Sequence, residues 1–593
     1  GIIPGCETHT NTNNRWATVV NTTTAAHRKE DSARAQATMA RGGRSSGLSA
    51  SVMATAVATV GVAIALAMAA GSAEATVVDT DCHPMDLANN NITDYIRWSS
   101  TSNRLYLENG ACITMTDIYN SRVDKTGNKG PLYPYDETTK QTTETVTGSW
   151  YLTSDIYVTG GSKLLIHGSS KGGDCDHLLL ASSPGRGRHP ATVLNLRAHG
   201  GDIVLYGTHV ETWDMAAGDN HRDYRGGRSY ISAISEVIGA VPYTCLERPK
   251  ENMGEARLDI IDSEVNHLGW DDSESYGIAY KVRGFCKDLS NPEIFDEVSV
   301  RGDILGSNIH HNYFGHYSYG HQGGNWSNNE VHDNIGYGFD PHDDSDNLII
   351  HDNHVHNNGW HGIIASKRCG NVSIQNNHVH DNGMIDDNGN RIGNGIMLHR
   401  SSDDGIVKNN LVHDNFDSGV ALYESSNNEI TNNKIYGNKN GIRMSLGSSD
   451  NLIHDNEILI NGPDAKYAIY LYRGNDLPGV AGEGADGRPR RNRIYSNTII
   501  SDDEVVKMLN SDETAFEGNV IYGRYSRFED SYNTMWHGNF LEDDIHEFKL
   551  THGSCFDPAG DVTAPDRGGG RALVSEEEGY SYSYSYSYEY TPS

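Results

Sequence analysis

The stretch NHVHNN at residues 353–358 is followed one short interval later by NHVHDN at residues 377–382. Related units flank this pair, and each places an aliphatic residue two positions after an Asn: NEVHDN at 329–334, NLVHDN at 410–415, NKIYGN at 433–438 and NEI at 456–458. Their aliphatic positions, from Val331 onward, step by 24, 24, 33, 23 and 23 residues. A repeat of this length built from short strands is typical of a parallel β-helix, in which each coil buries its apolar face against neighbouring coils.

Composition supports this interpretation. The 593 residues include 64 Gly and only 36% hydrophobic residues, which fits short strands separated by polar turns. A leucine-rich repeat has a similar period, but it requires a Leu-rich consensus that is absent here. We therefore predict an all-β protein, a single-stranded right-handed parallel β-helix. The recurring Asn is interpreted as scaffold, since stacked amides can hydrogen-bond from one coil to the next.

The repeat also sets the expected domain boundaries. We expect the β-helix to occupy residues 146–545 as the catalytic domain, with an N-terminal cap region at residues 76–145. Residues 546–593 end in alternating Tyr and Ser, and we expect this low-complexity tail to be disordered. The step of 33 residues is a coil that carries an insertion at 384–394, and another insertion follows at 474–489. Insertions in solenoids usually emerge on the binding face.

The N-terminal residues predict export. Residues 1–38 lack apolar periodicity, and we interpret them as a non-structural upstream segment. Residues 39–75 have the order of a signal peptide, with Arg41 and Arg44, an apolar run and the small residues AEA at 73–75. A transmembrane anchor is the alternative, because the apolar run approaches the length that spans a bilayer. After signal cleavage we expect no membrane association and a secreted protein, in the extracellular space or the cell wall.

Seven cysteines follow the expected cleavage site. In an oxidising compartment some of them should pair, although their connectivity does not follow from the sequence. The simplest pairs join Cys82 with Cys112 and Cys245 with Cys286.

The formal net charge of −32 argues against nucleic acid as a partner, because a phosphate backbone needs a basic surface. An anionic polysaccharide is repelled in the same way. It can still bind through a local cluster of Arg and Lys or through divalent cations, since screening confines charge effects to about 10 Å. We expect the protein to act as a monomer.

A second strand of each coil predicts a functional surface. The strands align on a small first residue: GFDPH at 338–342, GIIAS at 362–366, GIMLH at 395–399, GVALY at 419–423, GIRMS at 441–445 and AIYLY at 468–472. Alternate positions are wholly apolar and must point inward. The other positions point outward in two columns: Asp340, Ile364, Met397, Ala421, Arg443, Tyr470, and His342, Ser366, His399, Tyr423, Ser445, Tyr472. This strip of imidazoles, phenols and cations suits an anionic sugar chain, and a merely solvated sheet face is the alternative.

The segment YGFDPHDDS at 337–345 closely resembles the YGxDPHD signature of the mannuronan C5-epimerases. The similarity continues through HGIIASKR at 361–368 and HRSS at 399–402, and it broadly covers residues 300–475. The resemblance implies a parallel β-helix that converts β-D-mannuronate to α-L-guluronate within alginate or polymannuronate. The GGxGxD calcium modules of the secreted bacterial enzymes are missing. We therefore expect no obligatory cofactor, and binding of Ca²⁺ stays open.

Epimerisation requires three chemical roles, because the C5 hydrogen beside a carboxylate is very weakly acidic. One group must neutralise the sugar carboxylate, one must remove the proton and one must return a proton to the opposite face. Arg368 and Arg400 are the candidates for neutralisation, assisted by Lys367 and Arg443, since a guanidinium can bind a carboxylate at two points.

The resemblance singles out Tyr337 and His342 as the pair that removes and returns the proton, and which does which stays open. Asp340 is expected to hold His342 or one of the cations. The expected catalytic set is thus Tyr337, His342, Asp340 and Arg368, with no metal ion. Residues of the strip assigned to substrate binding are Lys367, His361, His399, Arg400, Tyr423, Arg443, Tyr470, Tyr472 and Arg473.

Other functions stay open at this point. The same carbanion can expel the C4 oxygen, which would make the protein a polyuronate lyase. A hydrolase of the polygalacturonase type is disfavoured, because the outward columns offer chiefly Asp340 and Glu424 rather than a close carboxylate pair. A non-catalytic wall-binding protein would use the strip only as a platform. A further column on another sheet is interpreted as a solvated ladder, with metal binding as the alternative: His332, His356, His380 and His413.

Overall fold

The computed structural model describes residues 82–121, 130–185, 190–237, 253–272, 274–283, 298–474, 486–502 and 504–541, together with short strands between residues 547 and 576. The expected upstream segment, signal peptide and Tyr/Ser tail lie outside these residues, as do Cys245 and Cys286. Among the helices in the described ranges, none combines the length and apolar character needed to cross a membrane.

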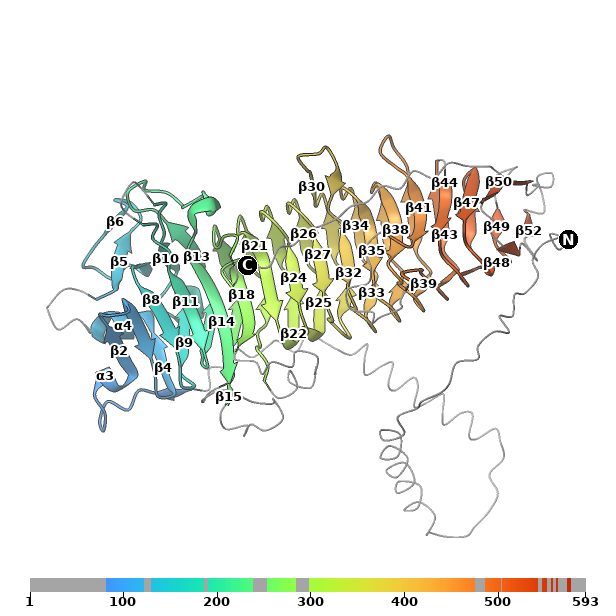
Figure 1. Ribbon diagram of the computed structural model, residues 1–593. Helices are drawn as coiled ribbons and strands as arrows, with labels where there is room; N and C mark the ends of the chain where they lie inside the picture. The colour runs from blue at the N-terminus through green and yellow to red at the C-terminus, as the bar shows by residue number, and fades with distance from the viewer. Residues whose placement is uncertain are drawn as a thin grey trace, which may run out of the picture. The chain divides into compact units, whose positions relative to one another are not determined.

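Each coil contains three short strands joined by tight turns (Figure 1). One coil, for example, runs through β22 (Gln322–Ser327), β23 (Glu330–His332) and β24 (Phe339–His342). Each strand pairs in parallel with its counterpart in the next coil, so the coils build three long sheets, called here A, C and B in chain order. The predicted parallel β-helix is therefore confirmed.

The strands of the repeat region are distributed as follows. Sheet A contains β22, β25 (Asp346–His351), β28 (Ser373–Gln375), β33 (Ile406–Lys408), β36 (Glu429–Thr431) and β39 (Leu452–His454). Sheet C contains β20 (Asn308–His310), β23, β26 (His354–His356), β29 (His378–His380), β34 (Leu411–His413), β37 (Lys434–Tyr436) and β40 (Glu457–Ile460). Sheet B contains β18 (Gly277–Arg283), β21 (Phe314–Tyr319), β24, β27 (Ile363–Ser366), β32 (Ile396–His399), β35 (Ser418–Tyr423), β38 (Asn440–Ser445) and β41 (Tyr467–Tyr472).

The interior is filled by the aliphatic positions of the repeat. Val355 and Val379 of sheet C, and Phe339 and Ile363 of sheet B, are fully buried. Each such side chain contributes about 1.5–3 kcal/mol of stability when it leaves water. A slip of one residue would turn the whole apolar set toward solvent, so this pattern fixes the register of the sheets.

Two ladders of Asn side chains line the corners on either side of sheet C. In the first, Asn329 Nδ2 donates to Asn353 Oδ1 at 2.9 Å, and Asn353 Nδ2 donates to Asn377 Oδ1 at 2.9 Å. In the second, Asn334 Nδ2 donates to Asn358 Oδ1 at 2.8 Å. The amides are buried and satisfied, so the predicted scaffold role of the repeated Asn is confirmed.

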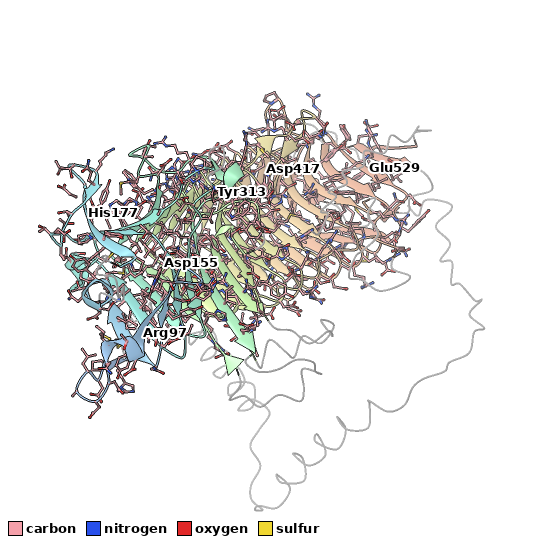
Figure 2. The ribbon with its side chains drawn as sticks, turned by 60° about the vertical axis from the view of Figure 1, so that its left-hand side comes forward. Arg97, Asp155, His177, Tyr313, Asp417 and Glu529 are labelled. Carbon is pink, nitrogen blue, oxygen red and sulfur yellow. A yellow bond between two sulfur atoms is a disulfide. The ribbon has the colours of Figure 1, made fainter. Side chains whose placement is uncertain are left out.

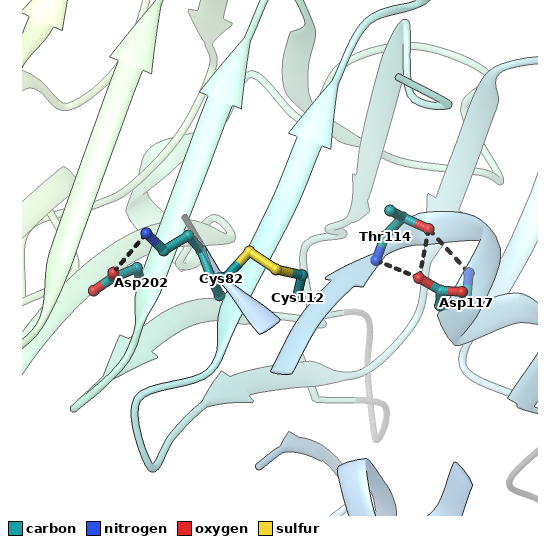
Figure 3. The surroundings of a disulfide bond; sticks show 6 residues. Cys82, Cys112, Thr114, Asp117 and Asp202 are labelled. Atoms are coloured by element: carbon teal, nitrogen blue, oxygen red, sulfur yellow. Dashed lines mark hydrogen bonds and ion pairs between the residues drawn. A yellow bond between two sulfur atoms is a disulfide. The ribbon is translucent and has the colours of Figure 1, made fainter. Parts of the chain in front are cut away.

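The N-terminal end of the solenoid is closed by α3 (Ile92–Tyr95), α4 (Met115–Ser121) and the antiparallel pair β2 (Ile96–Ser99) and β3 (Arg104–Leu107). A disulfide joins Cys82 to Cys112, as predicted, and the Thr114 hydroxyl donates to Asp117 at the start of α4 (Figure 3). The cap is not separate from the coils, however. β3 pairs in parallel with β8 (Asp155–Val158), and β4 (Ala111–Thr114) with β9 (Lys163–His167), so the coils begin before residue 146.

Strands also continue beyond residue 545. β50 (Glu547–Thr551) pairs in parallel with β47 (Tyr525–Glu529), and β53 (Leu573–Glu576) pairs with β50. The physical reason is visible in β50, where alternating Phe548 and Leu550 are buried and extend the core. The solenoid therefore reaches into the segment that was expected to be disordered.

Candidate active site on sheet B

The strands of sheet B follow one another from β24 to β41 (Figure 1), and their register brings the predicted columns together. In register, His342 lies beside Ser366, Ser366 beside His399, and His399 beside Tyr423. The column continues with Ser445 and Tyr472, and the neighbouring column runs in register through Ile364, Met397, Ala421, Arg443 and Tyr470. Successive members are about 4.8 Å apart. Both columns thus occupy one sheet, as the alternation predicted.

The column that starts at Asp340 is largely covered. Asp340 is 1% exposed, Ile364 4% and Met397 6%. The aromatic side chains of Tyr337 and Tyr423 pack against the apolar members of this column. Alternation along a strand assigns a residue to the outer face, but it does not reveal which side chains cover that face.

Tyr337 lies just before β24 in an aromatic cluster. Its ring stacks on His361, with centroids 5.4 Å apart, and it contacts Phe314 at 4.8 Å and Trp360 at 5.0 Å. Tyr337 itself is half-buried, so the cluster fixes its ring while part of the side chain stays accessible. The structure thereby brings Tyr337 and His361 together.

His361 is held in one protonation state. The backbone N–H of Asn394 donates to His361 Nδ1 at 2.9 Å, and because that group can only donate, Nδ1 must carry the lone pair. Burial, together with nearby Arg443, lowers the pKa of His361 to about 3. The imidazole is therefore neutral, with its proton on Nε2. Asn394 ends the 384–394 insertion, which emerges between β29 of sheet C and β32 of sheet B.

His399 is the second neutral imidazole of the site. Ser366 Oγ lies 3.0 Å from His399 Nδ1, and the His399 ring packs on Tyr423 with centroids 4.9 Å apart. Burial holds the pKa of His399 well below its usual value, and the positive charge of Arg400 acts in the same direction. His361, His342 and Lys367 add to this effect, which places them in one electrostatic neighbourhood.

His342 lies beside a carboxylate. Its Nδ1 lies 2.7 Å from Asp343 Oδ2. Burial opposes ionisation of Asp343, but His342 and the nearby cations outweigh it and hold the pKa of Asp343 below its usual value. Asp340, in contrast, is enclosed, and burial raises its pKa to about 7. The expected support of His342 by Asp340 is therefore supplied by Asp343 at closer range.

Arg368 is anchored by two carboxylates. Its Nε and Nη2 donate to Asp344 at 2.9 and 2.7 Å, and Nη2 also donates to Asp343 at 3.0 Å. Lys367 Nζ lies 3.9 Å from Asp343 Oδ2. These contacts leave the third nitrogen of the guanidinium, Nη1, without a hydrogen bond among the described residues. Arg368 is thus a rigidly oriented cation rather than a free one.

Arg400 occupies the equivalent turn one coil later. Its Nε is buried and has no hydrogen-bond partner within the described ranges, and no carboxylate of those ranges lies within ion-pair distance. It differs from Arg368 in this respect. An unpaired guanidinium at the end of β32 is suited to accept an anionic group from a ligand.

The turns that carry these cations have an unusual backbone. Lys367, Arg368 and Arg400 have φ angles of 61°, 61° and 52°, in the left-handed region that few non-glycine residues adopt. The same conformation recurs in neighbouring turns, for example at Ser401 and Glu424, so it belongs to the geometry of the coils and does not by itself mark a functional site. No sequence pattern predicts this conformation for Lys or Arg.

The remaining predicted residues lie farther along sheet B. Arg443 Nη1 donates to Asp417, labelled in Figure 2, at 2.8 Å, so its charge is already compensated. Tyr470 and Tyr472 stack on one another with centroids 4.6 Å apart, and Arg473 follows them on an exposed turn. Tyr470, Tyr472 and Arg473 extend the surface beyond the His342 region, whereas Arg443 lies near His361 and donates to Asn394 Oδ1 at 3.4 Å.

Several residues of the site were not predicted. Asp343 and Asp344 stand within the quoted YGFDPHDDS motif, and Asn394 closes an insertion, so the motif and the insertion were available signals. No feature of the sequence pointed to Trp360. Among the described residues, the groups of His and Glu that come close enough to share a metal ion lie on sheet C and not on sheet B.

Comparison with known families supports the fold. Residues 289–403 match the family model described as right handed beta helix region, which confirms the predicted handedness. Residues 381–544 match the model described as periplasmic copper-binding protein (NosD).

Curated relatives and a solved structure agree. The chain is 31% identical over 206 residues to the mannuronan C5-epimerase of Pseudomonas putida, a match that covers 34% of this chain and 37% of the relative. It is 30% identical over 182 residues to the mannuronan C5-epimerase of Pseudomonas syringae pv. tomato, covering 31% of this chain and 32% of the relative. The chain thus spans about a third of the length of the curated relatives it matches.

The crystal structure of the periplasmic alginate epimerase AlgG has the same fold, with a TM-score of 0.52, 20% sequence identity and coverage of 71% of this chain and 85% of that chain. At this identity the likeness concerns the fold alone. The resemblance of this chain to the mannuronan C5-epimerase family is therefore confirmed by named relatives over about a third of its length.

Proposed function

We propose that the protein is an isomerase that converts β-D-mannuronate to α-L-guluronate within alginate, a mannuronan C5-epimerase. One observation carries the proposal: His342, within ion-pair distance of Asp343, lies in one neighbourhood with neutral His399 and the cation Arg400. This combination offers a base, a buried neutral imidazole and a carboxylate-binding group along one sheet. The named relatives support the same activity.

In the proposed mechanism Arg400 binds the sugar carboxylate, and Arg368 assists through its remaining nitrogen. Because Asp343 and Asp344 hold Arg368 in one orientation, its side chain loses little freedom when the substrate binds. The two guanidinium groups stabilise the negative charge that develops on the carboxylate as C5 loses its proton.

His342 acts as the base. His342 Nδ1 lies 2.7 Å from Asp343 Oδ2, and a proton on Nδ1 leaves the lone pair on Nε2 to accept the C5 proton. The electron pair of the broken C–H bond moves into the carboxylate and forms an enediolate. Asp343 compensates the positive charge that His342 gains.

Tyr337 returns a proton to the opposite face of C5, which forms the new C–H bond and inverts the centre. The phenol ordinarily keeps its proton at neutral pH, so it suits the role of acid. Its ring is fixed against His361 and Trp360, and this holds the hydroxyl in a constant position. Proton exchange with water then resets both side chains.

We also propose that the protein is exported and that its partner is a polyuronate. The disulfide between Cys82 and Cys112 supports export, because disulfides persist in oxidising compartments.

The test is incubation of purified protein with polymannuronate, followed by proton NMR of the polymer and absorbance near 235 nm. We expect guluronate signals without a rise in absorbance. A rise in absorbance would identify a lyase instead, and an unchanged polymer would leave only a binding function.

A further inference from the structure

The outer face of sheet C carries a block of imidazoles that the proposed function does not use. β26 presents His354 and His356 outward on either side of a buried valine, and β29 presents His378 and His380 in the same way. The register pairs His354 with His378 and His356 with His380. Four half-buried imidazoles from two adjacent coils therefore share one patch of surface.

Three of these side chains can reach a common point. One ring nitrogen each of His354, His378 and His380 lies within 4.8 Å of the other two. Nε2 of His354 is 2.7 Å from Nε2 of His380. Zinc binds imidazole nitrogen at about 2.0–2.1 Å, so one ion can be shared by these three side chains once His378 Nε2 leaves His413 Nε2, which lies 2.7 Å from it.

The orientation of His380 favours metal binding. Asp381 Oδ2 lies 2.7 Å from His380 Nδ1, which fixes the proton on Nδ1 and leaves the lone pair on Nε2. A carboxylate behind a histidine is the usual support of a metal ligand. Glu330 adds negative charge to the patch, with Oε1 3.4 Å from His356 Nε2 and 3.9 Å from His354 Nδ1.

Stacking of the coils does not by itself require histidine at these positions. Further along sheet C, the two columns contain Lys434 and Tyr436 in β37, then Glu457 and Leu459 in β40, with the parallel register unchanged. The presence of histidine at both columns of two successive coils is therefore not explained by coil stacking, and we attribute it to the capacity of imidazole to bind a metal ion.

A second group on sheet C, His177, His209 and Glu211, is a weaker candidate. Its carboxylate already accepts from Asn220 and contacts His177 Nε2 at 3.1 Å, and His177 Nδ1 contacts Glu137 at 3.0 Å. These groups satisfy one another as an ion-pair network.

We propose that His354, His378 and His380 bind one divalent transition-metal ion of the zinc or copper type, with water at the remaining position. Imidazole ligands favour these ions over calcium and magnesium. The site joins β26 to β29, so the bound ion links two coils and stabilises the folded solenoid increasingly as the free metal concentration rises above the Kd. The site belongs to a different sheet from the candidate active site.

The test uses the full chain without a histidine tag, stripped with a chelator. Titration with Co²⁺ followed by visible absorption, and with Zn²⁺ by calorimetry, should show one tight equivalent. The variant that combines His378→Lys with His380→Tyr copies the Lys434 and Tyr436 found in the same columns, and we expect it to lose that equivalent. Copper should compete more strongly than zinc.

Two further variants keep the experiment decisive. Asp381→Asn leaves all three ligands in place and should weaken binding by about 10–100-fold. His454→Ala removes a similar His–Asp pair from sheet A and should bind as the wild type does. In the presence of chelator the melting temperatures should agree, and added Zn²⁺ should raise only those of the proteins that keep the site. Absence of saturable binding, or unchanged stoichiometry and affinity in the double variant, would overturn the proposal.

Discussion

The outer faces of sheets B and C are built by the same coils, yet they follow opposite rules. From β26 to β29 sheet C repeats its outward residues, with His354 beside His378. From β27 to β32 sheet B changes them, from Ile364 to Met397 and from Ser366 to His399. A face that repeats can offer the same ligand at every coil. A face that varies can place a base, a cation and an aromatic ring at successive positions, as a reaction on one sugar requires.

The largest effect should come from the base on sheet B. We expect His342→Ala to slow C5–H exchange in deuterated water by about 10²–10⁴-fold, because removal of a positioned base removes that share of the rate. The matched control is His332→Ala on sheet C, which should exchange at the wild-type rate with an unchanged circular dichroism spectrum. Equal rates in both variants would eliminate His342 from the mechanism.

The next effect concerns the cation. Arg400→Gln should lower kcat/KM by about 10²–10³-fold, the usual loss when one group that stabilises the developing charge is removed. Arg491→Gln serves as control. Arg491 is exposed, lies away from sheet B and pairs with Asp450 at 2.6 Å. Steady-state kinetics on polymannuronate decides the matter. A wild-type value for the Arg400 variant would transfer the role to Arg368 alone.

Asp340 should couple stability to pH. Burial raises the pKa of Asp340 in the folded state from 3.8 to about 7. The contribution of Asp340 to the free energy of unfolding is therefore fully present below about pH 4 and is lost as pH rises through about 7. Asp340→Asn removes this loss, so its stability relative to wild type should increase between pH 4 and pH 8, by at most roughly 4 kcal/mol. Urea unfolding at both pH values measures this, with Asp333→Asn on the sheet C side as control. A pH-independent difference would contradict the assignment.

The smallest effect should lie at the far end of the surface. Tyr472→Ala removes one ring of a stacked pair and should raise KM about 2–10-fold with little change in kcat, since an aromatic contact contributes about 0.5–1.5 kcal/mol. Tyr436→Ala removes a ring at a comparable position on sheet C and should leave KM unchanged. An equal rise in both would show that sheet B is not the substrate surface.

The repeat made the solenoid and both outward columns predictable, because a fixed period and strict alternation leave one register that buries Val355 and Ile363 together. The details of the site depend on contacts between coils that the period does not encode. The pairing of Arg368 with Asp344 spans 24 residues, and the bond from Asn394 to His361 spans 33. The burial of Asp340, which is 1% exposed, likewise does not follow from alternation along its strand. The boundaries near 146 and 545 were misplaced because the end coils diverge from the Asn template.

The Asn ladder makes the protein modular. Asn329 donates to Asn353 and Asn353 donates to Asn377, so residue 353 and residue 377 present the same interface to the coil before them. If residues 353–376 were removed as one block, Asn377 would take the place of Asn353 beside Asn329. The solenoid would become shorter by about 4.8 Å. Its length can thus change by gain or loss of whole turns, while the outward residues of the remaining turns stay in line.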